Sequence, residues 1–378
     1  MHTSDHHVQG LDNDQVIADW PAISAADVAW LKGRYPQLAG DCEVVWHSPR
    51  PFSAAALLQS PQGRFFVKRH HHHVRSAAVL EEEHSFIAHL ADAGVPVVHV
   101  LPDRAGATAV EHGDWTFELH AEAPGEDVYR DVPSWTPPND VEQAWQAGRM
   151  LATLHNAADS YHAPQRGTHV LVARDELIRA EDPIALLKMQ LPQRPGLADY
   201  LAGRPWEAEL QRAILPWHFG VAARLATVPR RWGHNDWHVS NLLWHQRGRA
   251  NAVAAVLDFG LASPASHLFD LATAIERNAI AWLELERGGA AVRGDIALAL
   301  IVGYRDARPL TAGQVHLLAD LLPLVHLDFA LSEVEYFHGI TGSTANADVA
   351  YYTFLLGHAD WFRAAHGQAL LATLRAAA

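Results

Sequence analysis

The chain has 378 residues, of which 49% are hydrophobic, enough for a large packed core. Its formal net charge of −14 argues against nucleic acid and anionic membranes as partners. No apolar run reaches the roughly 20 residues of a membrane helix, and the N-terminus lacks the basic start and apolar stretch of a signal peptide. A single cysteine, Cys42, rules out an internal disulfide framework. We therefore expect a soluble cytoplasmic protein.

The predicted elements begin after a polar N-terminal segment. Residues 1–23 are rich in histidine and have no hydrophobic period, which predicts a mobile tail. Ser24 is a typical N-cap residue and opens a predicted helix whose apolar residues share one face, namely Val28, Leu31 and Tyr35. Pro36 ends this helix.

Short strands and one helix fill the next hundred residues. The strands are predicted from apolar runs separated by turns, over 42–47, 53–60, 64–70, 108–112 and 114–120. Between the third and the fourth strand, residues 76–93 predict a helix with three consecutive glutamates, Glu81, Glu82 and Glu83. The sequence thus predicts a β-meander with a helix beside it.

From residue 140 the pattern becomes helical. A broad apolar stripe predicts a helix over 140–158, and a further helix is expected over 206–226. We interpret residues 160–203, rich in proline and arginine, as an insertion with short helices. Residues 290–378 are predicted to be helical, with a tight turn at 307–311.

Residues 233–260 carry the chemistry. They predict a hairpin whose two buried strands span 241–245 and 252–259 and are joined by a turn at 246–251. Closing this hairpin brings Asn241 close to Asp258, while Asp236 lies on the loop before it. Oxygen ligands of this kind suit Mg²⁺. A carboxylate kept off the metal can then receive the proton of an acceptor hydroxyl.

The order of these residues resembles a known family. The superfamily of aminoglycoside phosphotransferases and choline kinases has a catalytic loop H-G-D-x-H-x-x-N, to which this chain is similar at His234, Asp236, His238 and Asn241. Residues 258–260 of this chain, D-F-G, resemble the metal motif of the same family. The resemblance implies a bilobal, protein-kinase-like α+β fold, with a small antiparallel β-sheet N-lobe over 24–123 and a larger, mostly helical C-lobe over 124–378. The alternative is an ordinary polar loop before a buried hairpin.

The resemblance also implies roles for the main polar residues. Asp236 is expected to be the catalytic base, and Asn241 and Asp258 are expected to bind Mg²⁺. Lys68 is expected to neutralise the α- and β-phosphates of ATP. Glu83 is expected to hold that lysine, with Glu82 as the alternative.

Supporting roles are implied as well. His234 is expected to brace the catalytic loop, and His238 either braces it or lines the acceptor side. Asp270 is expected to accept backbone hydrogen bonds from the loop. Main-chain groups of the hinge residues Ala121 and Ala123 are expected to bind adenine.

The phosphate-covering turn departs from the family pattern. Residues 48–53 read S-P-R-P-F-S, with two prolines and no glycine, so few backbone N–H groups can reach a phosphate. Ser53 or Arg50 is expected to supply the missing contact. An exposed loop charge explains Arg50 equally well.

Acidic residues of the C-lobe are candidates for recognising the acceptor molecule. Glu276 is the first of them. A second acidic wall is suggested by the helical spacing of Asp328, Ser332 and Glu335, although a solvated helix face explains that spacing equally well. The negative net charge is compatible with a cationic acceptor.

The expected activity is ATP- and Mg²⁺-dependent transfer of the γ-phosphate to a hydroxyl of a small molecule, such as an amino alcohol, a homoserine-like compound, an aminoglycoside or a sugar. Residues 303–311 are weakly similar to the homoserine kinase branch of the superfamily. One alternative is a protein kinase, although the chain lacks an arginine before Asp236 and an A-P-E element. The others are a catalytically silent nucleotide-binding scaffold and a metal binder built on His70 to His73, where a solvated strand end is the simpler explanation. The choice of ATP or GTP and the oligomeric state stay open.

Overall fold

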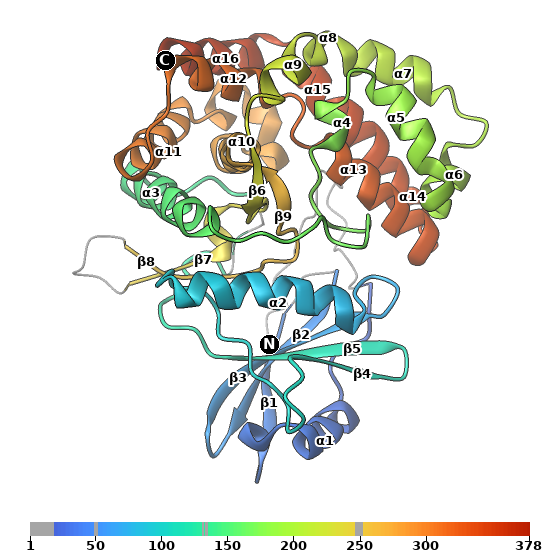
Figure 1. Ribbon diagram of the computed structural model, residues 1–378, viewed down its shortest axis with the longest axis vertical. Helices are drawn as coiled ribbons and strands as arrows, with labels where there is room; N and C mark the ends of the chain where they lie inside the picture. Colours follow the sequence, from blue (N-terminus) through green and yellow to red (C-terminus); the bar gives the residue numbers. More distant parts are fainter. Residues whose placement is uncertain (1–18, 49–51, 131, 133–134, 246–251) are drawn as a thin grey trace.

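The computed structural model describes residues 19–48, 52–130, 132, 135–245 and 252–378. Arg50, residues 1–18 of the predicted tail and the turn predicted at 246–251 lie outside these ranges. The described chain forms a smaller lobe built on a β-sheet and a larger lobe of helices, as Figure 1 shows. This arrangement confirms the predicted bilobal α+β fold.

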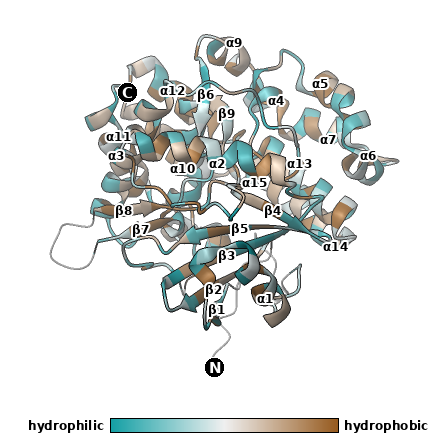
Figure 2. Ribbon diagram, turned by 60° about the horizontal axis from the view of Figure 1, so that its bottom comes forward, coloured by the Kyte–Doolittle hydropathy of each residue, from teal (hydrophilic) through white to brown (hydrophobic). Residues whose placement is uncertain are grey.

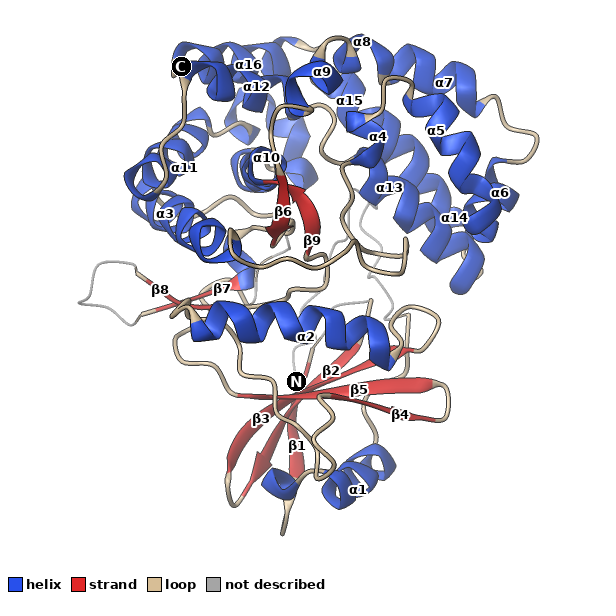
Figure 3. Ribbon diagram, viewed as in Figure 1, coloured by secondary structure: helices blue, strands red, loops and turns tan. Residues whose placement is uncertain are grey.

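A five-stranded antiparallel sheet forms the smaller lobe (Figure 3). Its strands lie in the order β1-β2-β3-β5-β4. From β1 to β5 they span Glu43–His47, Ala54–Ser60, Gly63–His71, Ala109–His112 and Trp115–Ala121. Because the central strand β3 pairs with β5, Lys68 lies directly opposite Glu118. All five predicted strands are confirmed.

Helix α1 (Ala25–Arg34) covers one face of this sheet. Ser24 and Asp27 form a capping box at its start, as expected for a serine at the N-cap. The apolar face of the helix packs with sheet residues such as Leu58 and Phe117. After α1, the chain makes a short 3₁₀ turn, η1 (Pro36–Leu38).

Helix α2 (Ala77–Asp92) lies between the sheet and the helical lobe (Figures 1 and 3). Ser76 caps it by accepting a hydrogen bond from the backbone N–H of Val79. Its apolar residues Phe86 and Leu90 belong to the core of the helical lobe. The helix therefore connects the two lobes.

The last residues of the predicted tail are packed, which corrects the prediction of an unpacked segment through residue 23. The Trp20 ring stacks on His71, with ring centroids 4.8 Å apart, and its indole N–H donates to the hydroxyl of Tyr336 at 3.0 Å. Ile23 is buried in the core of the sheet lobe. Since Tyr336 belongs to the helical lobe, residues 19–23 bridge both lobes.

The larger lobe is helical, as predicted. Its α-helices, α3 to α16, span Val141–Ala158, Glu176–Arg179, Pro183–Gln190, Pro195–Leu201, Trp206–Ala213, Leu215–His218, Val221–Leu225, His267–Ala279, Gly294–Ala307, Ala312–Leu321, Leu327–Val334, Thr344–Asp348, His358–Trp361 and Ala365–Ala376. Further 3₁₀ segments are η2 (Leu191–Gln193), η3 (Val239–Asn241) and η4 (Trp282–Ala291), and π-helical segments are η5 (Glu335–Ile340) and η6 (Val349–Gly357).

These helices carry hydrophilic and hydrophobic residues along the same ribbon (Figure 2), as expected for elements with one face on a core. Within the described ranges, none of them has the length and apolar character needed to span a membrane. The single helix predicted over 206–226 is wrong, because the chain forms α7, α8 and α9 there. Gly220, with φ of 74°, separates the last two.

Two further antiparallel sheets have two strands each. The predicted hairpin is confirmed as β7 (Leu242–Trp244) and β8 (Val253–Val256). The second pair, β6 (Arg230–Gly233) and β9 (Ser263–Ser266), was not predicted. Together the two pairs enclose the loop that carries Asp236.

The segment after β5 is held against the hairpin. Glu126 and Trp244 exchange two backbone hydrogen bonds, at 2.8 and 2.9 Å. Gly125 has φ of 110°, and a Cβ atom there would lie 2.6 Å from the Cβ of Ala254. Glycine is required at this position, because both the backbone conformation and the close approach exclude a side chain.

Candidate active site

The loop between β6 and β7 is anchored by Asp270 on α10. Its carboxylate accepts the backbone N–H groups of His234 and Asn235, at 2.8 and 2.9 Å. A Cβ atom on Gly233 would lie 2.5 Å from Asp270 Oδ2, so only glycine allows this approach. The expected contacts of Asp270 with the loop are present. His155 of α3 supports the same carboxylate at 3.0 Å.

His234 braces the loop with both ring nitrogens. Its Nε2 lies 2.8 Å from the carbonyl of Leu257, and its Nδ1 lies 3.2 Å from the backbone nitrogen of Asp236. A ring that donates from Nε2 and accepts at Nδ1 is neutral. His234 therefore ties Asp236 to the segment that leads into Asp258.

Two neighbours hold the carboxylate of Asp236. The amide of Asn241 donates to Oδ2 at 3.2 Å, and Arg277 Nη1 lies 2.6 Å from Oδ1. His238 Nε2 lies further away, at 3.8 Å from Oδ1, and its Nδ1 pairs with Ser240. The Asp236 side chain is 14% exposed.

Arg277 is a residue that the sequence reasoning missed. It is buried on α10, and its guanidinium lies over the rings of Trp135 and Phe329. The signal was present in the spacing. Seven residues separate it from Asp270, which is about two helical turns, so both point to the same side of α10. Glu276, six residues after Asp270, lies about 120° away around the helix.

The hairpin brings Asn241 and Asp258 together. The carbonyl of Asn241 accepts the backbone N–H of Leu257 at 2.8 Å, and Asp258 is the next residue in the chain after Leu257. Asp258 has φ of 55°, and Asn235 has φ of 59°. Such left-handed conformations are uncommon for non-glycine residues, cost energy and concentrate at functional sites. Asn235 directly precedes Asp236, and Asp258 is the residue expected to bind Mg²⁺.

The residues at the end of the hairpin fit a magnesium ion. Asn241 holds Asp236 with its amide nitrogen, and its side-chain carbonyl oxygen is an atom of the kind that binds Mg²⁺. Asp258 adds a carboxylate that is about one third exposed. An amide oxygen and a carboxylate beside solvent match the few oxygen ligands through which proteins bind Mg²⁺.

Lys68 reaches across from the sheet lobe to this end of the hairpin. Its Nζ lies 3.2 Å from Asp258 Oδ1. Burial by itself lowers the pKa of Lys68, but the charges of Asp258, Glu118 and Glu83 together outweigh this effect and raise the pKa above its usual value. The lysine is therefore charged and linked to the predicted metal ligand.

The expected ion pair between Lys68 and Glu83 is wrong for this structure. Glu83 is buried on α2 and pairs with the buried Arg166, with Nη2 3.2 Å from Oε2. Glu82, the alternative partner, lies 3.9 Å from the same guanidinium. The physical reason is that Arg166, from the segment before α4, reaches α2 and satisfies both carboxylates.

Two buried arginines connect this region to the metal motif. Arg75 and Arg166 both donate to the carbonyl of Gly260, at 3.1 and 2.8 Å. Arg75 also donates to the carbonyls of Val170 and Leu171. Burial lowers the pKa of Arg75 to about 10, so it remains charged at neutral pH. The position of Gly260 is thus fixed from two sides.

Glu118 on β5 is a second buried carboxylate that the sequence reasoning missed. It faces Lys68 in the β3–β5 ladder. Three histidines surround it, with His70 at 3.0 Å and His84 and His120 both at 2.8 Å. Alternation along β5 was the available signal, because it places residues 118 and 120 on the same face.

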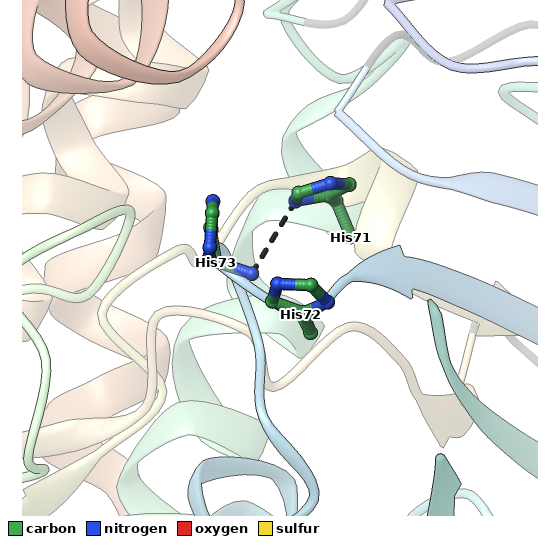
Figure 4. A group of neighbouring side chains, drawn as sticks. All are labelled: His71, His72 and His73. Atoms are coloured by element: carbon green, nitrogen blue, oxygen red, sulfur yellow. Dashed lines mark hydrogen bonds between the residues drawn. The ribbon is translucent and has the colours of Figure 1, made fainter. Parts of the chain in front are cut away.

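The histidine run at the end of β3 divides into two groups. His70 faces inward to Glu118. His71, His72 and His73 lie together at the surface, and Figure 4 shows their rings around one turn, with the backbone N–H of His73 donating to His71 Nδ1 at 3.3 Å. Their ligand atoms lie within 4.8 Å of one another.

The hinge offers two main-chain groups. The N–H of Ala121 donates to the carbonyl of His99 at 2.9 Å, so Ala121 can offer a ligand only its carbonyl. No backbone partner of the Ala123 N–H lies within the described residues. Ser53 lies directly before β2, and its neighbour Phe52 packs on the ring of Tyr336 at 5.4 Å. The nucleotide roles of Ser53, Ala121 and Ala123 stay predictions.

The candidate acceptor residues are all buried. Glu276 is 2% exposed and contacts His358 at 3.2 Å, whereas its neighbour Arg277 is the residue that reaches Asp236. Asp328, Ser332 and Glu335 are buried too, so a solvated helix face is wrong as an explanation of their spacing. Whether these residues read an acceptor stays a prediction.

Comparisons with known proteins agree with this geometry. A protein of Deinococcus radiodurans, described as an uncharacterized protein, is 27% identical over 304 residues, which cover 78% of this chain and 76% of that one. The solved structure of amicoumacin kinase hAmiN in complex with AMP-PNP, Ca²⁺ and Ami has a TM-score of 0.59 at 14% identity, over 88% of this chain and 92% of that chain. A microcompartment-associated aminopropanol kinase has a TM-score of 0.54 at 16% identity, over 88% and 98%. At these identities the likeness shows the fold.

The family follows from a match over most of the chain. The profile of a family described as the phosphotransferase enzyme family matches residues 52–310. That span contains the catalytic loop, the metal motif and Lys68. Because the match covers more than half of the chain, this protein belongs to the phosphotransferase enzyme family and is a phosphotransferase.

Proposed function

We propose that this protein transfers the γ-phosphoryl group of ATP, together with Mg²⁺, to a hydroxyl group of a small molecule. The observation that carries the proposal is the contact between Lys68 and Asp258, 3.2 Å long, which joins the sheet lobe to the catalytic hairpin next to Asp236. Phosphoryl transfer needs such a set of positioned charges more than covalent chemistry.

Asp236 is the proposed catalytic base. It takes the proton of the acceptor hydroxyl as the oxygen attacks the phosphorus. Asn241 and Arg277 fix the direction of the carboxylate, since one holds Oδ2 and the other holds Oδ1. Each carboxylate oxygen has a further lone pair with which to accept the proton.

Lys68 is the proposed contact of the α- and β-phosphates. Nearby carboxylates, Asp258 first among them, keep it charged, and it lies on the central strand of the sheet. Asn241 and Asp258 are the residues that would hold Mg²⁺, which supplies positive charge to the phosphate oxygens when it is bound. In this proposal the lysine and the metal ligands surround the nucleotide phosphates from opposite lobes.

The adenine base is proposed to bind at the hinge. The carbonyl of Ala121 can accept from the exocyclic amine of adenine, and the N–H of Ala123 can donate to a ring nitrogen. The two groups are two residues apart in extended chain, so they face the same side. Recognition through the main chain explains why both residues are alanine.

The acceptor is proposed to enter on the side of α10 and α13, beside Asp236. Arg277 and Phe329 lie there, and Trp135 packs on the same guanidinium. The amicoumacin and aminopropanol kinases of similar fold are named for small molecules, which favours a small-molecule acceptor over a protein.

The test is ADP formation with a panel of hydroxylated acceptors, comprising amino alcohols, hydroxy amino acids, aminoglycosides and sugars, and with casein as a protein acceptor. Asp236→Asn should lower kcat by orders of magnitude and leave ATP affinity, measured by calorimetry, nearly unchanged. Asp306→Asn, on the exposed side of α11, is the matched control and should keep full activity.

Three outcomes would contradict the proposal. Phosphorylation of casein alone would make the protein a protein kinase. ATP binding without turnover on any acceptor would favour a silent scaffold. Turnover that persists in Asp236→Asn would move the base to another residue.

A further inference from the structure

We propose that His84, Glu118 and His120 form a second metal site, for zinc or a similar divalent transition ion, inside the sheet lobe. The site uses none of the residues assigned to Mg²⁺. It does not depend on the proposed phosphotransfer, because its ligands and its test concern the metal alone.

The three side chains converge on one point. Glu118 Oε2 lies 2.8 Å from His84 Nε2 and 2.8 Å from His120 Nε2. All three potential ligand atoms lie within 4.8 Å of one another. The residues are 4%, 1% and 5% exposed, so the group is closed off from bulk solvent. They come from two elements, α2 and β5, which the ion would connect.

The change needed to admit an ion is small. Zinc binds histidine nitrogen and carboxylate oxygen at about 2.0–2.2 Å in a tetrahedron, which separates neighbouring ligand atoms by about 3.3 Å. The two N···O distances would therefore widen by about 0.5 Å each. The two histidine nitrogens, which lie within 4.8 Å of each other, would come to the same separation of about 3.3 Å.

Neighbouring groups hold the ligands in position. His70 Nε2 lies 3.0 Å from Glu118 Oε1, which leaves Oε2 toward the other two histidines. Thr108 Oγ1 lies 2.9 Å from His84 Nδ1. When Nε2 binds a metal, Nδ1 carries the proton and donates it to such an oxygen. Metal-binding histidines are commonly fixed in this way.

The chemistry of the ligands selects the ion. Two imidazoles and a carboxylate suit zinc and related transition ions, whereas Mg²⁺ prefers oxygen ligands only. Nitrogens of three histidines lie within 3.0 Å of the Glu118 carboxylate oxygens, so the carboxylate already faces imidazole groups of the kind that bind zinc. The Asn241 and Asp258 pair and this group therefore take different metals.

The competing explanation is a closed set of hydrogen bonds, in which neutral histidines donate to Glu118 and no metal is involved. The surface group His71 to His73 is a second competitor for any metal that the protein retains. Those three residues follow one another on one turn, and none of them has a carboxylate partner among the described contacts. The two groups can be separated by substitution.

The experiment uses the full chain, without an affinity tag, stripped of metal and titrated with Zn²⁺ against a competing chelator. Bound zinc is counted by elemental analysis after dialysis. The wild type should retain one ion, and the variant with His71, His72 and His73 all changed to Asn should retain it too. Glu118→Gln should lose it. No retained ion in the wild type, or loss only in the surface variant, would overturn the proposal.

A second variant covers the case in which Glu118→Gln fails to fold. His120→Cys exchanges one zinc ligand for another, in a background where Cys42 is changed to Ser. With Co²⁺ it should show a thiolate-to-cobalt charge-transfer band that the parent lacks. Cobalt bound without that band would place the ion elsewhere and refute the site.

Discussion

Glu276 should make the stability of this protein depend on pH. The side chain is 2% exposed and sits beside His358, Trp282 and His326 in the helical lobe. Burial raises the pKa of Glu276 from 4.5 to about 7, and the charge of Arg277 opposes only part of this shift. Glu276→Gln removes the titration and keeps the size of the side chain.

The magnitude follows from linkage. In the native state the carboxyl group keeps its proton up to about pH 7, whereas in the unfolded chain it loses it near pH 4.5. Between these values the native state binds more protons, so stability falls as pH rises. A shift of this size corresponds to about 3 kcal/mol in total, of which about 2.5 kcal/mol falls between roughly pH 5 and pH 8.

The assay is urea unfolding of the wild type and Glu276→Gln at both pH values, followed by circular dichroism and tryptophan fluorescence. The difference between the two proteins isolates Glu276 from other titrating groups, such as His326, whose pKa burial lowers to about 4. We expect the stability of Glu276→Gln, relative to that of the wild type, to increase as pH rises. A difference that stays constant across this range would refute the idea that burial controls the group.

Three further substitutions test the frame of the site. Gly233→Ala should lower kcat and destabilise the protein by about 1–3 kcal/mol, because its Cβ would meet the carboxylate of Asp270, and kinetics with thermal unfolding would show it. Arg166→Met should lower stability in urea by about 3–5 kcal/mol, since Glu83 is left as a buried unpaired charge, and adding Glu83→Gln should restore part of it. Arg277→Gln should reduce kcat about 10- to 100-fold through the loss of a charge-assisted contact to the catalytic carboxylate, with the KM for ATP unchanged. A changed KM with an unchanged kcat would assign this arginine to substrate binding.

Much of the site could be predicted from short-range pattern. The N-cap at Ser24, the hairpin that carries Asn241 and the anchoring of the loop by Asp270 were all expected. In each case the information lies in residue type and spacing along a few turns of chain. Backbone hydrogen bonding and alternation act over that range, so a linear sequence expresses them directly.

The tertiary structure decided what depends on contacts between distant segments. Strands β6 and β9 have weak intrinsic preference, since β9 reads S-P-A-S, and they form because the chain brings them side by side. Trp20 was assigned to a tail, but it bridges the lobes through a hydrogen bond to Tyr336, which lies 316 residues later in the chain.

The partner of Lys68 shows the same division. The sequence offered three consecutive glutamates on one helix, and helical spacing could not choose among them. Arg166, which lies 83 residues after Glu83 in the chain, binds Glu83, so Lys68 pairs with Asp258 instead. Short-range pattern thus predicted which residues carry the chemistry, and long-range packing decided which charges pair with each other. The physical reason is that a buried charge is costly unless it is paired, and the fold decides which partner lies within reach.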